Sequence, residues 1–361
     1  MSRRVLVAMS GGVDSSVAAA MLHEGGYDVV GVAMRLAPEA ESRGRRRRGT
    51  CCSHEDFEDA RRVAERMGFP FYVVDMRSEF EARVIDNFVG QYLDGRTPNP
   101  CVMCNREIKF DLLWRRAAAL GAEFVATGHY ARIERDLGGR FHLMCAADRA
   151  KDQSYFLFAL GQRELSRTLF PLGAMTKSEV RTRARELGLA TADKPESQEI
   201  CFIPDNDYAS FVEKHAPRDR MRPGNIIDGE GRTLGSHAGI HRFTVGQRRG
   251  LGLAAGEPLY VKEIRADRGE VLVGARGELR AAGMIASNVS LVDSDSIGDG
   301  ACEVKVRYRH PPIPARLALE TDGRRARVRF DSGGPAVTPG QACVFYRGDE
   351  VLGGGFIERA L

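Results

Sequence analysis

A glycine-rich turn near the N-terminus constrains the fold of this chain more than any other feature. The turn Ser10–Ser16 reads Ser-Gly-Gly-Val-Asp-Ser-Ser; it follows the apolar run 5–8, which predicts a buried strand, and precedes residues 17–22, which predict a helix. A glycine pair between strand and helix lets backbone amides approach an anion, and the helix N-terminus adds partial positive charge. The turn therefore predicts a phosphate-binding loop, with serine hydroxyls as further donors and Asp14 as a candidate metal ligand.

This turn differs from the two commonest nucleotide-binding fingerprints. It matches neither Gly-x-x-x-x-Gly-Lys-Ser/Thr nor Gly-x-Gly-x-x-Gly. Its Ser-Gly-Gly-x-Asp-Ser pattern resembles the loop of the ATP pyrophosphatases, which cut ATP between its α and β phosphates and attach AMP to a substrate oxygen. An ordinary glycine-rich turn is the alternative, but the length of the match and its position between strand and helix favour phosphate binding.

Length and composition indicate an ordinary globular protein of two or three domains. The chain has 361 residues, of which 43% are hydrophobic and 28% are charged. The stretch before the first predicted strand is too short for a secretory signal, and no apolar run approaches the ~20 residues of a membrane span. We therefore expect a cytoplasmic protein with no membrane partner, and a monomer by default.

Charge alone does not indicate a nucleic-acid partner, because 53 basic and 49 acidic residues leave a net charge of +4. The basic residues are very unevenly chosen, since 46 of the 53 are arginines. This bias most simply reflects a GC-rich genome. It draws attention to the few lysines, four of which lie in motif-like segments: Lys109, Lys151, Lys177 and Lys194.

Strand and helix patterns alternate over roughly the first 200 residues, which predicts a parallel α/β sheet. Predicted strands cover residues 5–8, 29–34, 71–74 and 124–127, and predicted helices cover 55–67 and 106–120. In such sheets ligands bind at the carboxyl ends of the strands. This places the turn Ser10–Ser16, Met34 and Gly128–His129 around one pocket.

The sequence pattern changes near residue 205, where helical stretches become sparse and glycine and proline become frequent. Short strand patterns at 303–308, 327–330 and 342–346 then predict a small β-barrel. We therefore expect an α/β protein of three domains: a parallel-sheet nucleotide-binding domain over 1–204, a small mixed domain over 205–282 and a C-terminal β-barrel over 283–361. The arginine run Arg45–Arg48 predicts a solvated loop or, alternatively, a contact to a phosphate backbone.

The eight cysteines do not suggest a disulfide framework, because a structural network of that kind is unusual in a cytoplasmic protein of this size. Cys101 and Cys104 form a Cys-x-x-Cys pair before the predicted helix 106–120, and the helix N-terminus would stabilise the thiolate of Cys104. Such a pair can be redox-active, bind zinc or form half of an iron–sulfur site, but no second pair completes a zinc ribbon. The cysteines interpreted as structural or as small buried hydrophobes are Cys51, Cys52, Cys145, Cys302 and Cys343.

Three motifs together are specific: the turn Ser10–Ser16, Cys104 in Asn-Pro-x-x-x-Cys-Asn, and Cys201 in Glu-Ser-Gln-Glu-Ile-Cys-Phe-Ile. In this combination the chain resembles the bacterial tRNA-specific 2-thiouridylases, ATP pyrophosphatases with an adenine nucleotide α-hydrolase-like domain. The resemblance spans nearly the whole chain and includes the segments 50–53, 128–132, 151–157, 243–252 and 306–309. The run Arg45–Arg48 looks like a local addition to the family pattern.

The resemblance implies an enzyme that replaces the 2-oxygen of the wobble uridine of tRNA, position 34, with sulfur. A pyrimidine carbonyl oxygen is a poor leaving group, so ATP would first convert it to an adenylate, with Mg²⁺ offsetting the charge of the pyrophosphate. The resemblance implies the following nucleotide-binding residues: Ala8, Met9, Ser10, Gly11, Gly12, Val13, Asp14, Ser15, Met34 and Gly128.

The resemblance also implies roles for two cysteines. Cys201 would carry sulfur as a persulfide, received from a cysteine desulfurase or a sulfur-relay protein. Cys104 would be the partner nucleophile, releasing sulfide or closing a disulfide with Cys201. The substrate would be the anticodon stem-loop of tRNA, with the uridine flipped out of its stack. The resemblance implies that the central domain, 205–282, binds tRNA. Positions that match tRNA contacts of the family are His129, Lys151, Asp152, Gln153, Arg307, Tyr308 and Gln341.

The sequence departs from the family pattern at Cys101, where many members carry aspartate. The three cysteines Cys101, Cys104 and Cys201 could then converge on a four-iron four-sulfur cluster with one open iron site that carries sulfide. The persulfide and cluster mechanisms stand as alternatives on the sequence alone.

Two other classes of function each leave a motif unexplained. A small-metabolite ATP pyrophosphatase, which uses ammonia or an amino acid as nucleophile, would not need Cys104 and Cys201. A non-catalytic RNA-binding or cluster-carrying protein would not need the intact turn Ser10–Ser16. The motifs together therefore favour a tRNA sulfurtransferase.

Overall fold

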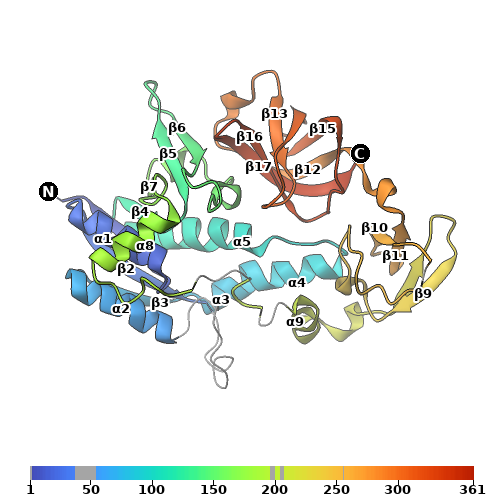
Figure 1. Cartoon of the computed structure of the whole chain (residues 1–361), viewed down its shortest axis with the longest axis horizontal. Coiled ribbons are helices and arrows are strands. Elements are labelled where there is room, and N and C mark those ends of the chain that lie inside the picture. Colours follow the sequence, from blue (N-terminus) through green and yellow to red (C-terminus); the bar gives the residue numbers. More distant parts are fainter. Residues whose placement is uncertain (1, 37–53, 196–199, 204–206, 255) are drawn as a thin grey trace. The chain divides into compact units, whose positions relative to one another are not determined.

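The computed structural model describes residues 2–36, 54–195, 200–203, 207–254 and 256–361. The chain divides into two compact units. The labels and colours of Figure 1 locate the elements of each unit along the chain. The first unit contains Met1–Val84, Cys101–Asn206 and Asp349–Val351, and the second contains Ile85–Pro100, Asp207–Gly348 and Leu352–Leu361. The Arg45–Arg48 run and the Cys51–Cys52 pair, which the sequence analysis singled out, lie outside the described residues.

The core of the first unit is a parallel sheet with the strand order β3-β2-β1-β4-β7. Its strands are β1 (Arg4–Ala8), β2 (Asp28–Arg35), β3 (Phe71–Asp75), β4 (Phe124–Thr127) and β7 (Thr168–Leu169). The central strand β1 is apolar and buried from Val5 onward, as expected for a parallel strand covered on both faces. The predicted parallel sheet is confirmed, and the ends of its predicted strands are each correct to within one residue.

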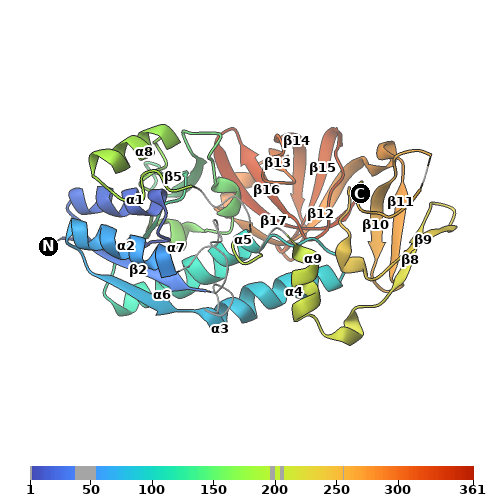
Figure 2. The same ribbon diagram turned by 60° about the horizontal axis from the view of Figure 1, so that its bottom comes forward.

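Helices α1 and α2 lie beside this sheet (Figure 2). Small apolar side chains of both helices belong to its core, among them Ala18 and Ala19 of α1 and Ala60 and Ala64 of α2. The helices of this part of the chain are α1 (Val13–Glu24), α2 (His54–Met67), α3 (Arg77–Phe80), η2 (Glu81–Ile85), α5 (Pro100–Met103), η3 (Cys104–Leu112), α6 (Leu113–Ala119), η4 (Ser154–Phe156), α7 (Gln162–Leu165) and α8 (Lys177–Glu186). After β4, a hairpin of β5 (Ala131–Arg135) and β6 (Phe141–Cys145) pairs with Glu350 and Val351.

The helix predicted over residues 106–120 begins earlier than expected. It starts with α5 at Pro100, continues through the π-helical segment η3 and ends with α6, after which Gly121 adopts a φ of +69°. Proline suits the first helical position because its missing N–H would be unpaired there in any case. Cys101 therefore lies in the first helical turn, and Cys104 lies further into the helix than the sequence predicted.

The second unit contains a small mixed region and a barrel. Its helices are α4 (Asp86–Leu93), α9 (Tyr208–His215), η6 (Arg218–Arg220), η7 (Ile240–Arg242), η8 (Arg276–Leu279) and η9 (Ser294–Ile297). The mixed region has a sheet of order β10-β11-β8-β9, formed by β8 (Gly224–Ile227), β9 (Thr233–His237), β10 (Tyr260–Arg265) and β11 (Glu270–Gly274). Ile226, Val261 and Val271 form the centre of its core.

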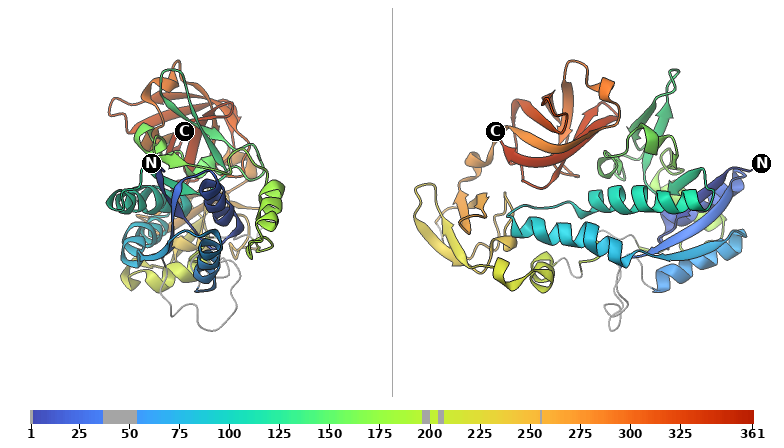
Figure 3. Two further views of the ribbon diagram at one scale, coloured as in Figure 1. Left: turned by 90° about the vertical axis from the view of Figure 1, so that its left-hand side faces the viewer. Right: turned by 180° about the vertical axis from the view of Figure 1, so that it is seen from behind.

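The predicted C-terminal barrel is confirmed (Figure 3). Its strands follow the order β12 (Ala281–Leu291), β15 (Arg325–Gly334), β14 (Ile313–Leu319), β13 (Ala301–Lys305), β16 (Ala342–Arg347) and β17 (Glu350–Ala360), and β12 also pairs with β17 to close the sheet. The strand predicted over 303–308 is wrong at its end, because β13 stops at Lys305 and the chain turns before Pro311 and Pro312, which cannot donate to a ladder. Among the helices that the structure describes, none is both long and apolar enough to span a bilayer.

Candidate active site

The carboxyl ends of β1 and β4 mark the expected ligand site of the parallel sheet. β1 pairs with β2 on one side and with β4 on the other. The chain therefore adds strands in one direction from β1 to β3 and in the opposite direction from β4 onward. In open α/β sheets such a reversal leaves a crevice where ligands bind. The turn Ser10–Ser16 follows β1 and Gly128 follows β4, so both predicted segments lie where such a crevice is expected.

The turn between β1 and α1 is built to receive an anion. Gly11 adopts a φ of +71°, and Gly12 precedes α1 in an extended conformation, with no side-chain cap among the described residues. The Ser15 hydroxyl oxygen accepts from the amide of Ser10 at 3.1 Å and lies 3.2 Å from the carbonyl of Gly12, to which it can donate. The first-turn amides of α1 have no partners within the helix, so they are available to phosphate oxygens.

Gly128 follows β4 and packs against the first turn of α1. A β-carbon at this position would lie 2.7 Å from the amide nitrogen of Ser15, closer than van der Waals contact allows. Glycine therefore permits the close approach of the end of β4 to the first turn of α1. Met34 lies near the carboxyl end of β2, and Met9 is buried after β1. The residues predicted to bind nucleotide thus gather at the ends of three adjacent strands.

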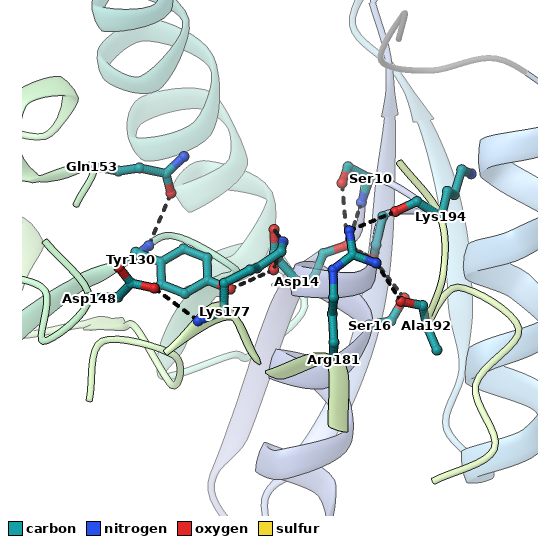
Figure 4. Close-up of polar contacts among 12 residues, drawn as sticks. Ser10, Asp14, Ser16, Tyr130, Asp148, Gln153, Lys177, Arg181, Ala192 and Lys194 are labelled. Carbon is teal, nitrogen blue, oxygen red and sulfur yellow. Dashed lines mark hydrogen bonds and ion pairs between the residues drawn. The ribbon is translucent and has the colours of Figure 1, made fainter. Parts of the chain in front are cut away.

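A buried cation neutralises the only carboxylate of the turn. The ammonium nitrogen of Lys177, at the start of α8, lies 2.7 and 2.8 Å from the two carboxylate oxygens of Asp14 (Figure 4). The hydroxyl of Tyr130 donates to the same carboxylate at 2.8 Å, and Lys177 is only 9% exposed. Because Asp14 is paired within the protein, its charge does not oppose binding of phosphate at the neighbouring amides.

A second lysine contacts the turn from another direction. The ammonium nitrogen of Lys194 donates to the carbonyl of Gly11 at 3.0 Å, and to Asp56 at 2.7 Å and Asp59 at 2.6 Å on α2. Burial acts to lower the pKa of Lys194, but its hydrogen bonds with Asp56 and Asp59 outweigh burial and hold this pKa above its ordinary value. Lys194 is therefore charged at neutral pH.

Sequence reasoning placed Lys177 and Lys194 in motif-like segments but gave neither a role. The signal that could have identified them is the scarcity of lysine in a chain whose cations are nearly all arginine. Both positions call for a compact ammonium group that fits between a carboxylate and the backbone, which a planar guanidinium does not reproduce.

The three cysteines singled out by motif all lie in the first unit. Cys101 is exposed on α5, Cys104 is partly buried at the start of η3, and Cys201 is partly buried in a turn. Phe202 packs edge-on against Phe80 of α3, with ring centroids 5.5 Å apart, and α3 contacts η3. This packing brings the segment after Cys201 to an element that also touches the helix of Cys104.

The described residues contain no group of three His, Cys, Asp or Glu side chains placed as metal ligands.

Two of the three isolated cysteines are confirmed as buried hydrophobes. Cys145 and Cys343 are buried, whereas Cys302 is only partly buried. Burial raises the pKa of Cys343 to about 12 and that of Cys302 to about 11. These two thiols stay protonated at neutral pH and are poor nucleophiles.

Three of the residues matched to tRNA contacts make internal hydrogen bonds in the first unit. The ring of His129 is buried, and its Nδ1 lies 2.7 Å from the hydroxyl of Thr127. Burial, together with the positive charge of Lys109, lowers the pKa of His129 well below its ordinary value, so the ring is neutral. Buried Asp152 accepts from the amides of Ala146 and Ser154.

Gln153 accepts from the amide of Tyr130 at 3.0 Å and so supports the residue that donates to Asp14. Lys151 is partly exposed in the same loop.

The other matched residues lie in the second unit. Arg307 is exposed in the turn after β13 and donates to the hydroxyl of Thr338 at 2.9 Å, and Tyr308 beside it is partly buried. The side-chain amide of Gln341 donates to the carbonyls of Thr97 and Pro98 at 2.9 and 3.2 Å. Arg307 thus presents charge to solvent, whereas Gln341 also stabilises a neighbouring loop.

Three domain families match the chain in succession. Residues 3–205 match the tRNA methyl transferase HUP domain, residues 209–275 the tRNA methyl transferase PRC-barrel domain, and residues 281–357 the aminomethyltransferase beta-barrel domain. Among solved structures, a 4-thiouridine synthetase in complex with RNA and ATP covers 60% of this chain and 50% of its own, with a TM-score of 0.39 and 18% identity. That structural similarity is too low to bear on function.

Relatives of known family match the chain from end to end. The tRNA-specific 2-thiouridylase MnmA of Geobacter metallireducens is 52% identical over 366 residues, which are 99% of this chain and 98% of the relative. The protein of the same name from Geotalea uraniireducens is 53% identical over 368 residues, 99% of this chain and 96% of the relative. These matches agree with the motifs on which the sequence resemblance rested. The chain therefore belongs to the family of tRNA-specific 2-thiouridylases, which are tRNA sulfurtransferases.

Proposed function

We propose that this protein uses ATP to replace the 2-oxygen of the wobble uridine of tRNA, position 34, with sulfur, and that it does so in the cytoplasm. The observation that carries the proposal is the open phosphate-binding turn at the ends of β1 and β4, in the same unit as Cys104 and Cys201. Family membership supplies the class of substrate.

The nucleotide would bind with its phosphates on the turn after β1. The amides of Ser10–Ser15 would contact phosphate oxygens, and the backbone of Gly128 would leave room for them. Both oxygens of Asp14 accept from Lys177, so Mg²⁺ would be held chiefly by the phosphates, as it often is in such sites. When bound, Mg²⁺ would offset the negative charge of the departing pyrophosphate.

Sulfur would pass from Cys201 to the uridine through a disulfide exchange with Cys104. Cys201 would receive sulfur as a persulfide from a cysteine desulfurase or a relay protein, and the thiolate of Cys104 would attack the inner sulfur of Cys201. This forms a Cys104–Cys201 disulfide and releases hydrosulfide, which attacks C2 of the adenylated uridine and displaces AMP. Two electrons from an external thiol then restore both cysteines.

We propose the persulfide route because Cys104 and Cys201, which lie in the same unit, can carry it without a further group; the iron–sulfur cluster on Cys101, Cys104 and Cys201 is the alternative. The remaining matched residues, Lys151 and Gln153 in the first unit and Arg307, Tyr308 and Gln341 in the second, are proposed to contact tRNA. His129 and Asp152 would act from buried positions, by holding the loop segments that flank the crevice.

The test is a thiolation assay on anaerobically purified protein whose iron and sulfide contents are measured first. With ATP, unmodified tRNA and either sulfide or a desulfurase, we expect 2-thiouridine, AMP and pyrophosphate from iron-free protein. Cys104→Ser and Cys201→Ser should abolish thiolation by the desulfurase route, and Cys302→Ser, a matched control in the barrel, should not. Activity that rises with bound iron and disappears on its removal would overturn the persulfide mechanism.

A further inference from the structure

Asn105 is buried directly after Cys104, the cysteine that is proposed to attack the persulfide. The residue is only 4% exposed, and its side-chain nitrogen donates to the carbonyl of Phe156 at 3.2 Å. The oxygen of the same amide, Oδ1, is buried and has no hydrogen-bond partner among the residues that the structure describes. Burying a polar atom without a partner is unfavourable, so Asn105 occupies this position at a cost in stability.

Helix formation does not account for an asparagine at this position. Cys104 and Asn105 are the first two residues of the π-helical segment η3, and π-helical turns are rare segments that occur frequently at functional sites. Asparagine is a poor helix former because its amide competes for nearby backbone groups. Here the amide leaves the helix and reaches Phe156, which lies 51 residues further along the chain. Asn105 therefore attaches the start of η3 to a loop and does not serve the helix itself.

The loop that Asn105 contacts also supports the phosphate-binding turn. The amide of Phe156 donates to the carbonyl of Gln153 at 3.0 Å, and the side-chain oxygen of Gln153 accepts from the amide of Tyr130 at 3.0 Å (Figure 4). The hydroxyl of Tyr130 donates in turn to Asp14. All of these residues are described and belong to the first unit. The proposed nucleophile is thus attached, through its neighbour, to the loop that borders the turn where nucleotide is proposed to bind.

We propose that Asn105 is a positioning residue that holds the thiol of Cys104 in line for its attack on the persulfide of Cys201. In this attack the thiolate of Cys104 forms a bond to the inner sulfur of Cys201. The bond between the two persulfide sulfurs breaks, and its electron pair leaves with hydrosulfide. Such a displacement is fast only when the reacting atoms are aligned, so a small shift of the thiol lowers the rate. The inference rests on the proposed function for the roles of the two cysteines.

The experiment compares two sulfur sources with the full-length protein. Thiolation driven by the desulfurase needs the exchange between Cys104 and Cys201, whereas thiolation driven by added sulfide needs only the adenylated uridine. Asn105→Leu removes both the donor and the unpaired oxygen with little change in side-chain volume. We expect its kcat by the desulfurase route to fall by about tenfold or more with KM for tRNA unchanged, because a misplacement of about 1 Å can cost about 10²-fold. Sulfide-driven thiolation should keep the wild-type rate, which also shows that the variant is folded.

A chemical probe reports on the thiol without tRNA or sulfur transfer. Iodoacetamide should alkylate Cys104 severalfold faster in Asn105→Leu than in the wild type, as read by peptide mass spectrometry. The reason is that a partly buried thiol becomes more accessible when the turn that carries it loosens. Alkylation of Cys302 in the same sample is the internal reference and should not change. A thiol that reacts faster with the probe but transfers sulfur more slowly has lost its position, whereas general unfolding would accelerate both cysteines.

Further variants separate position from size and charge. Asn105→Asp keeps the shape of the side chain but replaces its donor with an oxygen, so it should lose the desulfurase route as Asn105→Leu does. This variant keeps the inference testable if Asn105→Leu does not fold. Asn105→Gln retains an amide and should recover part of the rate. Arg106→Gln is the matched control, because it removes an exposed ion pair with Glu107 from the adjacent position of η3.

Three results would overturn the inference. These are a wild-type rate by the desulfurase route in folded Asn105→Leu or Asn105→Asp, an equal loss with the desulfurase and with sulfide, or an unchanged alkylation rate of Cys104. Failure of the proposed function would look different. If Cys104→Ser still thiolated tRNA with the desulfurase, Cys104 would not be the nucleophile, while the alkylation rates would still show whether Asn105 holds its thiol.

Discussion

At the scale of single residues, the pair Asp14–Lys177 shows how an acidic residue is tolerated inside an anion site. Lys177→Met would leave the Asp14 carboxylate unpaired beside the turn. Losing one partner of a buried ion pair costs about 3–5 kcal/mol, and the side chain of Asp14 is 30% exposed, so we expect a smaller loss of about 1–3 kcal/mol in the free energy of unfolding.

A double-mutant cycle in urea checks this expectation. Asp14→Asn combined with Lys177→Met should be more stable than Lys177→Met alone, because no isolated charge remains. Losses that simply add in the double variant would show that the two side chains do not interact.

The chemistry of the turn Ser10–Ser16 could be predicted from sequence because its glycines and the following helix act locally. The roles of Lys177 and Lys194 could not, since each reaches a partner more than a hundred residues away in the chain. The burial of His129 and Asp152 could not be predicted from sequence either, because it depends on packing around the loops after β4 and β6. Local chemistry was thus predictable and long-range pairing was not.

At the scale of elements, the hairpin β5–β6 is tied to Glu350 by a histidine. Nδ1 of His142 lies 2.6 Å from Glu350, and Nε2 lies 3.3 Å from Asp136. The hydrogen bond with Glu350 raises the pKa of His142 above its ordinary 6.5; burial opposes this rise and Asp136 adds to it. Because the folded-state pKa is raised, this stabilisation is fully present below pH 6.5 and is lost as the pH rises through the folded-state value.

His142→Gln should lower the free energy of unfolding, and the loss should be largest near pH 6 and shrink towards pH 9. Urea unfolding of both proteins at each pH measures this loss. A difference that is constant over this range would mean that His142 stabilises the hairpin only as a neutral ring.

The early helix start at Pro100 gives Cys101 a different setting from the one expected. Cys101 is exposed in the first turn of a helix that runs on through η3 and α6, where a negative charge is favoured. Cys101→Asp should therefore stabilise the protein by about 0.3–1 kcal/mol. Cys101→Lys is the matched control and should destabilise it; equal effects of both charges in thermal unfolding would contradict this argument.

Helix periodicity indicated most of this helix but not its first turn. Residues 100–105 contain a proline and two cysteines in place of a repeating apolar face, so the pattern became visible only at residue 106. The π-helical geometry of η3 has no signature in the pattern, because it depends on hydrogen bonds shifted by one residue. The first four strands of the buried sheet could be predicted more readily from sequence, since each is a short apolar run between turns.

At the scale of the whole molecule, tRNA binding cannot come from net charge. Basic residues exceed acidic ones by only four, so affinity for a polyanion must come from local groups placed at phosphates. The three-domain division remains a prediction. Residues 85–100 group with the second compact unit and residues 349–351 with the first, so the units do not follow the predicted boundaries. What matters for binding is therefore which individual arginines meet the RNA.

Arg307 provides the sharpest test of this view. Arg307 is exposed beside Tyr308, and its guanidinium donates to the hydroxyl of Thr338. No ion pair of Arg307 is described in the barrel, so its guanidinium can contact a phosphate without breaking one. Arg307→Ala should weaken tRNA binding, and the slope of log K against log salt should fall by about 0.7–0.9, the value for one phosphate contact. Arg316→Ala removes an equally exposed arginine from β14 and is the control. If both variants lose the same affinity at every salt concentration, the contribution of Arg307 is general charge; if only Arg307→Ala does, the turn after β13 contacts the tRNA backbone.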